Sequence, residues 1–295
     1  MKREAAIQTF GLAIGYSVRG GRRTVHPHLD LALYPGELTC LLGRNGAGKS
    51  TLLKTLCGLL PPLGGEVIIC DKSLRACSSA ELSSLVGVVL TDRTQAGGIT
   101  VYDLVSLGRY PHTGFFGTLR EADHEKVRGA IVAAGLAGKE ERHLAELSDG
   151  ERQKAFIAKV LAQECPVILL DEPTAFLDVT SRIETMLTLR ELARTQNKAV
   201  LVSSHDLDTA LQLADKLWLL PACDTSAEGA GKKAEPLYCG TPDSLVADGT
   251  LARFFESGRI AFDPVSRRLV SRNGKCCLRA GLPARGKGAG SSGDS

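Results

Sequence analysis

Short apolar runs alternate along the chain with amphipathic segments of helical period. A continuous apolar run of this length predicts a strand buried on both faces, which is typical of a parallel sheet. An alternation of such strands with helices predicts an α/β protein. We therefore expect buried strands over 38–42, 86–90, 167–170, 199–203 and 216–220, and helices from 52, over 79–85, over 121–134, from 148 to about 162, from 178 or 180 to 194, and over 207–215.

The N-terminal part of the chain follows a different pattern. Ile7 to Tyr16 alternates loosely and contains aromatic and β-branched residues, which predicts a strand. Gly20-Gly21 and Pro27 are expected to break the next segment, and Leu29 to Leu33 again alternates like a half-buried strand. A strand-rich N-terminal region therefore precedes a middle region that is mainly helical.

The C-terminal end of the chain lacks this periodicity. Beyond about Arg267 it is basic, and from Gly281 it is rich in glycine, serine and alanine, so we expect disorder there. The sequence thus predicts one domain over 1–270 and a tail over 271–295. A basic tail can contact an anionic membrane surface, but a plain solvated tail is the commoner outcome.

The composition excludes several classes of protein. With 295 residues the chain can form an ample core, and its formal net charge of +3 is too small to indicate a nucleic-acid partner. No apolar run approaches the roughly 18 residues of a membrane span, and the polar start is unlike a secretory signal. The nine cysteines are scattered without a C-x-x-C pair, which favours reduced structural thiols over a metal site or disulfides. We therefore expect a soluble, cytosolic protein.

The segment Gly43–Ser50, GRNGAGKS, matches the phosphate-loop pattern G-x-x-x-x-G-K-[ST] at every fixed position. It lies between a predicted strand and a predicted helix, so its backbone N–H groups should point at one spot. Lys49 can then neutralise the outer phosphates, and the Ser50 hydroxyl is placed to bind Mg²⁺. The alternative is a glycine-rich turn without a ligand, but the flanking elements favour nucleoside triphosphate binding. The expected nucleotide contacts are Gly43, Arg44, Asn45, Gly46, Ala47, Gly48, Lys49, Ser50 and Thr51.

Three further polar residues follow predicted buried strands. Asp171 and Glu172 end the run Val167–Leu170, and His205 follows Ala199–Ser203. Ligands of open α/β sheets gather at the carboxyl ends of the strands, and two carboxylates there are costly without a cation or proton chemistry. We therefore expect Asp171 on the Mg²⁺ side of the site and Glu172 beside the attacking water. The alternatives are a solvated carboxylate pair and a structural histidine.

Three other features allow both a structural and a functional interpretation. Ser148 and Glu151 have the spacing of a capping box, which makes a good helix start but also favours an anion near the free N–H groups. The aromatic residues in the glycine-rich loop Gly108–Gly117 form either a satellite core or a partner-binding surface. Tyr16 fits either a core tyrosine or a ring stacked on a nucleobase.

Taken together, these motifs resemble the ATP-binding subunit of an ABC transporter, from about Ile7 to Val270. The resemblance implies an α/β phosphate-loop NTPase core with a mostly parallel sheet, an N-terminal antiparallel β subdomain and an inserted helical subdomain at about 92–165. The matching positions are the phosphate loop Gly43–Thr51, Tyr16 as the adenine-stacking aromatic, Ser148 and Gly150 in the signature loop LSDGE, Asp171 and Glu172 as the Walker B pair, Asp178 in the loop that spans the dimer, and His205 as the switch histidine.

In that family two copies hold two ATP between the phosphate loop of one and the signature loop of the other. The resemblance thus implies ATP and Mg²⁺ as cofactors, with a second copy of the chain, integral membrane permease subunits and, indirectly, a substrate-binding protein as partners. It places the chain peripherally at the cytoplasmic face of the membrane, without nucleic acid. The stretch Gly108–Gly117 and the run LQLADKLWLL further resemble importers of iron chelates, haem and cobalamin, which puts Tyr110–Phe116 near the permease.

Two positions depart from the family pattern. The usual signature is LSGGQ, whereas Asp149 and Glu151 here add negative charge beside a polyphosphate. At roughly 5–6 Å and an effective dielectric of about 60, the repulsion is on the order of 1 kcal/mol unless the side chains point away. After the strand Val86–Leu90 the family has a glutamine that contacts Mg²⁺, whereas this chain has Thr91. We expect Thr91 to bind the metal weakly, or Gln95 to reach it if the loop shifts.

Two other functions fit parts of the sequence. A soluble ABC-type ATPase that acts on ribosomes or DNA usually has two ATPase units or a long coiled coil, and we find one unit and no heptad run. A phosphate-loop kinase or GTPase leaves the signature loop without a purpose, and no guanine-reading N-K-x-D element follows the second carboxylate strand. The sequence therefore favours the transporter subunit.

Overall fold

The computed structural model describes residues 3–19, 21–90, 98–114, 117–222, 236–257 and 259–271. The chain divides into two compact units, one up to Leu245 and one from Val246. The domain predicted over 1–270 therefore includes parts of both units. The tail predicted over 271–295 lies outside the described residues, apart from Ser271.

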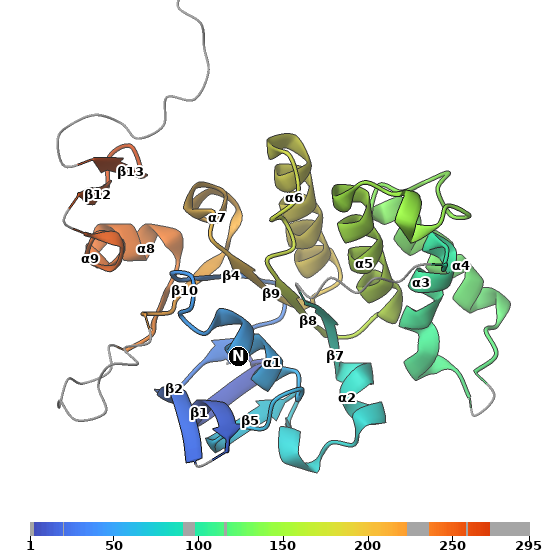
Figure 1. Cartoon of the computed structure of the whole chain (residues 1–295), viewed down its shortest axis with the longest axis horizontal. Helices are drawn as coiled ribbons and strands as arrows, with labels where there is room; N and C mark the ends of the chain where they lie inside the picture. The colour runs from blue at the N-terminus through green and yellow to red at the C-terminus, as the bar shows by residue number, and fades with distance from the viewer. Residues whose placement is uncertain are drawn as a thin grey trace, which may run out of the picture. The chain divides into compact units, whose positions relative to one another are not determined.

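A six-stranded sheet crosses the first unit (Figure 1). Its order is β11-β10-β4-β9-β8-β7, and all neighbours are parallel except the edge pair β10 and β11. The five apolar runs expected as buried strands all belong to this sheet, which confirms the predicted mostly parallel sheet. Its strands are β4 Leu38–Leu42, β7 Val86–Val89, β8 Val167–Asp171, β9 Ala199–Ser204, β10 Lys216–Leu219 and β11 Tyr238–Gly240.

The N-terminal strands form an antiparallel sheet, as expected from the family resemblance. The predicted break at Pro27 is wrong, because β2 continues through this residue. Proline is tolerated there because β2 is an edge strand and its pairing with β1 is irregular at this point. The expected strand over Leu29–Leu33 is divided between two strands. The strands of this sheet are β1 Ile7–Val18, β2 Gly21–Leu29, β3 Ala32–Leu33, β5 Gly64–Ile69 and β6 Lys72–Ser73.

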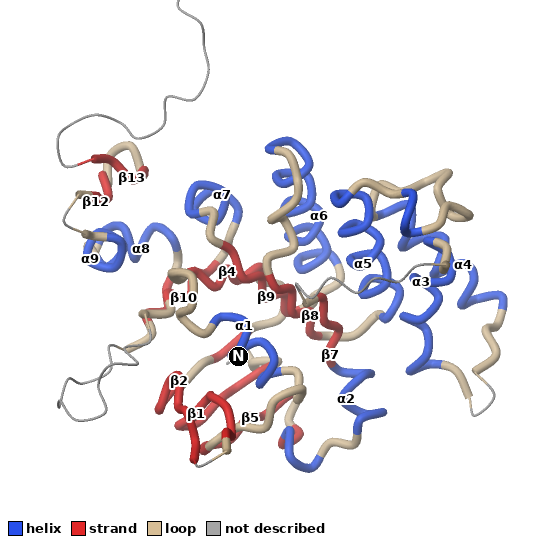
Figure 2. The backbone as a smooth tube through the Cα atoms, viewed as in Figure 1, coloured by secondary structure: helices blue, strands red, loops and turns tan. Residues whose placement is uncertain are grey.

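Helices cover both faces of the central sheet (Figures 1 and 2). Helix α1 (Lys49–Leu56) lies between the two sheets, where its leucines join a core that includes Ile7 of β1 and Leu169 of β8. Helices α6 (Val179–Thr195) and α7 (Leu207–Leu213) lie on the other face. Burial of both faces explains why the central strands are apolar without alternation. The short elements α2 (Ser79–Leu85) and η1 (Leu74–Ala76) precede β7.

Three helices in the middle of the chain form a separate layer around their own apolar cluster. They are α3 (Val101–Ser106), α4 (Glu121–Ala133) and α5 (Asp149–Gln163). Capping boxes begin α3 at Thr100 and α5 at Ser148, and the box at Ser148 is the one that the sequence predicted. The glycine-rich stretch expected as a loop instead begins as a 3₁₀ helix, η2 (Leu107–His112), and another short turn, η3 (Leu144–Glu146), precedes α5.

The second unit contains a helix, which the strand-plus-helix pattern over 237–239 and 242–255 predicts, and a small hairpin, which that pattern does not predict. Helix α8 (Pro242–Ala247) crosses the boundary, α9 (Thr250–Phe255) follows, and β12 (Ile260–Asp263) pairs antiparallel with β13 (Arg268–Ser271). The Asp263 carboxylate accepts hydrogen bonds from the turn, including the N–H of Val265 at 3.0 Å. These side-chain contacts close a hairpin in a segment that looks basic and irregular in sequence.

Candidate functional site

The carboxyl ends of three neighbouring strands bring the predicted polar residues together. In the sheet order, β4, β9 and β8 are adjacent and parallel. Leu42 pairs with Ser204, and Ser203 pairs with Asp171, so the segments after these strands leave the same edge of the sheet. The phosphate loop follows β4, and the predicted histidine and carboxylates follow its neighbours. Segments far apart in the sequence thus form one site.

The phosphate loop closes tightly around the Lys49 side chain. Gly46 and Gly48 have φ angles of 80° and 98°, which favour glycine, and a Cβ on Gly48 would lie 2.5 Å from a methyl carbon of Val25. Lys49 is 6% exposed, and its Nζ donates to the carbonyl oxygen of Gly43 at 3.0 Å. The ammonium group therefore lies inside the loop, as expected of a phosphate-binding lysine.

The side chain of Glu172 lies between two basic groups. One carboxylate oxygen, Oε1, is 3.7 Å from Lys49 Nζ, and the other, Oε2, is 3.7 Å from His205 Nδ1. Glu172 has a φ angle of 48°, in the left-handed region that non-glycine residues rarely adopt. Such strained residues cluster at functional sites. The predicted base, the phosphate-loop lysine and the predicted switch histidine therefore share one small space.

Asp171 is held by a residue that the sequence reasoning missed. The Ser203 hydroxyl donates to Asp171 Oδ1 at 2.6 Å and accepts the backbone N–H of Glu172 at 2.9 Å. The Asp171 side chain is buried, and the hydrogen bond from Ser203 holds its carboxylate in place. The run AVLVSS predicted only a buried strand, because the contact depends on the pairing of β8 with β9.

His26 is a second missed residue, and it contacts the phosphate loop from β2. Its Nε2 lies 2.8 Å from the carbonyl oxygen of Ala47, and because a carbonyl only accepts, this nitrogen carries the proton. Burial lowers the pKa of His26, so the neutral ring is favoured. The sequence offered no signal, because His26 falls in a segment where a break was expected.

Tyr16 contacts the first turn of α1, directly after the phosphate loop. Its hydroxyl forms a hydrogen bond of 2.7 Å with Thr51 Oγ1 in α1. The residue is 41% exposed, so the alternative of a core tyrosine is wrong. The anchored hydroxyl leaves the ring at the surface beside the phosphate loop. Stacking on an adenine stays a prediction.

The signature segment begins α5 with a complete capping box. The Ser148 hydroxyl accepts the N–H of Glu151 at 3.2 Å, and Glu151 Oε2 accepts the N–H of Ser148 at 2.9 Å. A salt bridge from Lys139 and the bond to Ser148 lower the pKa of Glu151 to about 2. Asp149 pairs with Arg152 Nη1 at 3.2 Å. Both extra negative charges of this signature therefore have a positive partner, which reduces the repulsion expected from them.

The signature segment lies beside the loop that ends in Asp178. A Cβ on Gly150 would lie 3.0 Å from Leu177 Cδ2, so glycine permits this close packing. Asp178 caps α6 by accepting the N–H of Ser181 at 2.9 Å. Ser148 and Asp178 are both exposed. The hydrogen bonds of the described residues do not join either of them to the phosphate loop of the same chain.

Some predicted residues fall outside the described part of the chain. Thr91 and Gln95 lie there, as do Phe115 and Phe116, so their predicted roles stay predictions. Among the described residues, no three His, Cys, Asp or Glu side chains gather as a metal cluster, and the cysteines are free thiols. The same described part of the chain contains no helix with the length and apolar character needed to cross a membrane.

This geometry defines a phosphate-loop nucleoside triphosphatase, with its lysine, strand-end carboxylates and histidine at one sheet edge. Residues 27–175 match the ABC transporter family. An uncharacterised ABC transporter ATP-binding protein of Methanocaldococcus jannaschii is 42% identical over 214 residues, 72% of this chain and 72% of that protein. The ferric enterobactin transport ATP-binding protein of Escherichia coli is 38% identical over 222 residues, 75% and 80% of the two chains.

A bacterial ABC transporter cassette whose solved structure is dimeric has the same fold. It is 25% identical, with a TM-score of 0.66 over 73% of this chain and 94% of that one. The chain belongs to the ABC transporter family, as an ATP-binding subunit, and it is an ATPase.

Proposed function

We propose that this ATPase drives the import of iron chelates such as siderophores, of haem or of cobalamin. The names of its relatives support this: they include transport proteins for ferric enterobactin in Escherichia coli, petrobactin in Bacillus anthracis and cobalamin in Halobacterium salinarum. The chain works with integral membrane permease subunits at the cytoplasmic face of the membrane, and indirectly with a substrate-binding protein. The exposed Tyr110 of η2 lies in the segment that we place against the permease.

The observation that carries the hydrolytic role is the position of Glu172 between Lys49 and His205. In the proposed site Glu172 accepts a proton from the water that attacks the terminal phosphorus, and His205 steadies the carboxylate and the phosphate. Lys49 stabilises the negative charge on the transferred group. The proton moves to Glu172, and the bond from phosphorus to the bridging oxygen breaks to leave ADP.

The residues around the phosphate loop suit a Mg²⁺ ion. Mg²⁺ prefers oxygen ligands and is usually held by one or two protein groups, with phosphates and waters completing its shell. The exposed Ser50 hydroxyl and the fixed Asp171 carboxylate supply such oxygens, and Thr91 is a further candidate. When bound, the ion neutralises charge on the phosphates. The remaining phosphate contacts come from the backbone and side chains of Gly43–Thr51, and Tyr16 stacks on the base.

The proposed active form is a dimer of two copies. Ser148 and Gly150 at the start of α5, together with Asp178, would cover the triphosphate held by the other copy. Ser148 and Asp178 are exposed in the single chain, which supports this arrangement, as does the solved cassette dimer. A helix start with its free N–H groups is suited to a phosphate.

Isolation of the native complex tests the proposed function. We expect the chain to purify with an integral membrane protein and to drive ATP-dependent uptake of an iron chelate, haem or cobalamin into vesicles. Vesicles without ATP and vesicles with the Glu172→Gln chain are the controls. Sedimentation with ribosomes and no membrane partner would contradict the proposal.

A change at His26 should weaken nucleotide binding. The Ala47 carbonyl and the Gly48 N–H belong to one trans peptide and point in opposite directions. The bond from His26 to this carbonyl therefore turns the Gly48 N–H toward the phosphate. We expect His26→Leu to raise the Kd for ATP about fivefold, because the loss of a hydrogen bond that contributes ~1 kcal/mol changes a Kd by that factor. His26→Gln keeps a donor and should restore most of the affinity. Equal Kd values for all three proteins in titration calorimetry would contradict this role.

A further inference from the structure

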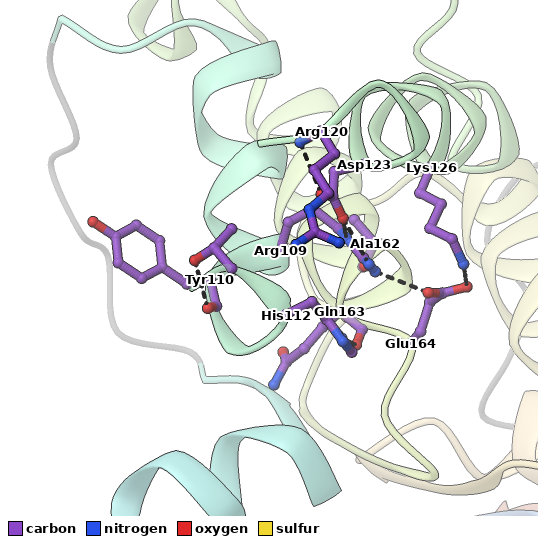
Figure 3. Close-up of polar contacts among 10 residues, drawn as sticks. Arg109, Tyr110, His112, Arg120, Asp123, Lys126, Ala162, Gln163 and Glu164 are labelled. Carbon is purple, nitrogen blue, oxygen red and sulfur yellow. Dashed lines mark hydrogen bonds and ion pairs between the residues drawn. The ribbon is translucent and has the colours of Figure 1, made fainter. Parts of the chain in front are cut away.

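The 3₁₀ helix η2 places its side chains in rows, because residues three apart are aligned in a helix of three residues per turn. Leu107 and Tyr110 form an outer row, and they are 50% and 65% exposed. Arg109 and His112 form a second row, in which Arg109 is only 4% exposed and His112 is exposed. In Figure 3 the Tyr110 ring points away from Arg109 and His112. One short element thus presents Leu107 and Tyr110 to the surface and buries the Arg109 side chain.

The second row of η2 binds the C-terminal end of α5 (Figure 3). Arg109 Nη1 donates to the carbonyl oxygen of Ala162 at 2.7 Å, and His112 Nε2 donates to that of Gln163 at 2.8 Å. The last carbonyls of a helix have no partner within it, and a positive charge there is favourable. Arg109 and His112 therefore cap α5 and attach η2 to its end.

The Arg109 charge is balanced by two carboxylates from other elements. Its Nε donates to Asp123 Oδ1 at 2.9 Å, and its Nη1 donates to Glu164 Oε2 at 2.9 Å. Asp123 Oδ2 accepts the N–H of Arg120 at the start of α4, and Lys126 pairs with the other oxygen of Glu164. Arg109 and Asp123 are buried, and a satisfied network with a buried centre is rigid. It joins η2, the start of α4 and the end of α5 into one body.

Helix α5 connects this body to the signature residue Ser148. Its 15 residues span about 22 Å, with Ser148 at one end and Gln163 at the other. The Gln163 side chain donates to the carbonyl oxygen of Val86 in β7 at 3.1 Å, so this end of α5 is tied to the central sheet. A small tilt at the tied end becomes a larger displacement at Ser148.

We propose that Arg109 and His112 are positioning residues that transmit contact at Tyr110 to the Ser148 end of α5. The inference rests on the proposed function, in which Tyr110 faces the permease and Ser148 faces the triphosphate of a second copy. When the permease displaces Leu107 and Tyr110 of η2, helix α5 moves with η2 as a rigid element. The permease thereby sets how often Ser148 reaches the position that closes the site.

The test compares substitutions of the second row in the intact complex with the permease. His112→Phe keeps a ring but removes the donor, and Arg109→Lys keeps the charge but cannot reach all the acceptors. His112→Gln retains a donor. Arg128→Gln is the matched control, because it breaks an exposed ion pair with Glu121 on α4 and leaves the end of α5 unchanged. The ATPase rate is measured for each isolated subunit and again in the complex.

We expect the basal ATPase rate to stay within about twofold of wild type in all variants. Stimulation by the permease should fall about fivefold or more in His112→Phe and in Arg109→Lys. Coupling between two sites usually changes an equilibrium by about fivefold or more, so its loss should have an effect of this size. It should stay within about twofold of wild type in His112→Gln and in Arg128→Gln.

Full stimulation in both His112→Phe and Arg109→Lys would overturn the inference, and so would an equal loss of basal ATPase in the two variants. A complex that is stimulated but imports none of the three substrate classes would contradict the proposed substrates alone. The comparison of stimulation would still decide the inference. A wild-type chain that no membrane protein stimulates would remove the proposed function and the inference with it.

Discussion

Glu172→Gln is expected to lower the ATP turnover rate on the order of a thousandfold, the usual contribution of a positioned general base. Glutamine has nearly the same shape and can occupy the same space between Lys49 and His205. It cannot accept a proton, however, so the attacking water is no longer activated. Nucleotide binding should persist because the phosphate loop is unchanged. We therefore expect ATP to stay bound and a closed dimer to accumulate.

Three measurements check this expectation. Phosphate release gives the turnover rate, titration with ATP gives the Kd, and size-exclusion chromatography with ATP and Mg²⁺ reports the dimer. Glu191→Gln, on the exposed face of α6, is the matched control and should hydrolyse ATP at the wild-type rate. Normal turnover in Glu172→Gln would show that another group accepts the proton.

Lys49→Ala is expected to abolish tight nucleotide binding. The Lys49 ammonium is buried inside the loop, where hydrogen bonds between charged groups are strong because little water competes. Loss of one such bond costs roughly 1.5–3 kcal/mol, so the Kd for ATP should rise by roughly tenfold to a hundredfold or more. The substitution also removes the positive charge nearest to Glu172, which should lower turnover further.

Titration of the purified variant with ATP measures this effect, and thermal unfolding in the absence of nucleotide shows whether the fold persists. Lys54→Ala, in the last turn of the same helix, tests a lysine outside the loop and should bind ATP normally. An unchanged Kd for Lys49→Ala, with an unchanged melting temperature, would contradict the phosphate-loop role.

The parts of the fold that were predictable depend on local pattern. The strands of the central sheet are apolar because both faces are covered, so their sequences alone identify them. The cap at Ser148 follows from Ser148 and Glu151, which are three positions apart and meet at the start of the helix. The phosphate loop is likewise a contiguous segment.

The contacts that were missed join segments distant in sequence. Pro27 looked like a break, but an edge strand with irregular pairing loses no hydrogen bond to it. The aromatic stretch looked like a loop, because the bonds from Arg109 and His112 to the end of α5 cannot be read from its own residues. The charges of Asp149 and Glu151 looked unfavourable until Arg152 and Lys139 were found beside them.

The sequence by itself determined that the chain binds a nucleoside triphosphate. The contiguous segment Gly43–Ser50 contains the glycines, the lysine and the hydroxyl that bind the phosphates and Mg²⁺. It also indicated Glu172 and His205 as candidates, since each follows a buried strand. Only the tertiary structure decided that both lie with Lys49 around one point, because the order of strands β4, β9 and β8 is set by packing across the sheet. The same packing placed Ser203 and His26 at the site, through contacts that no local pattern encodes.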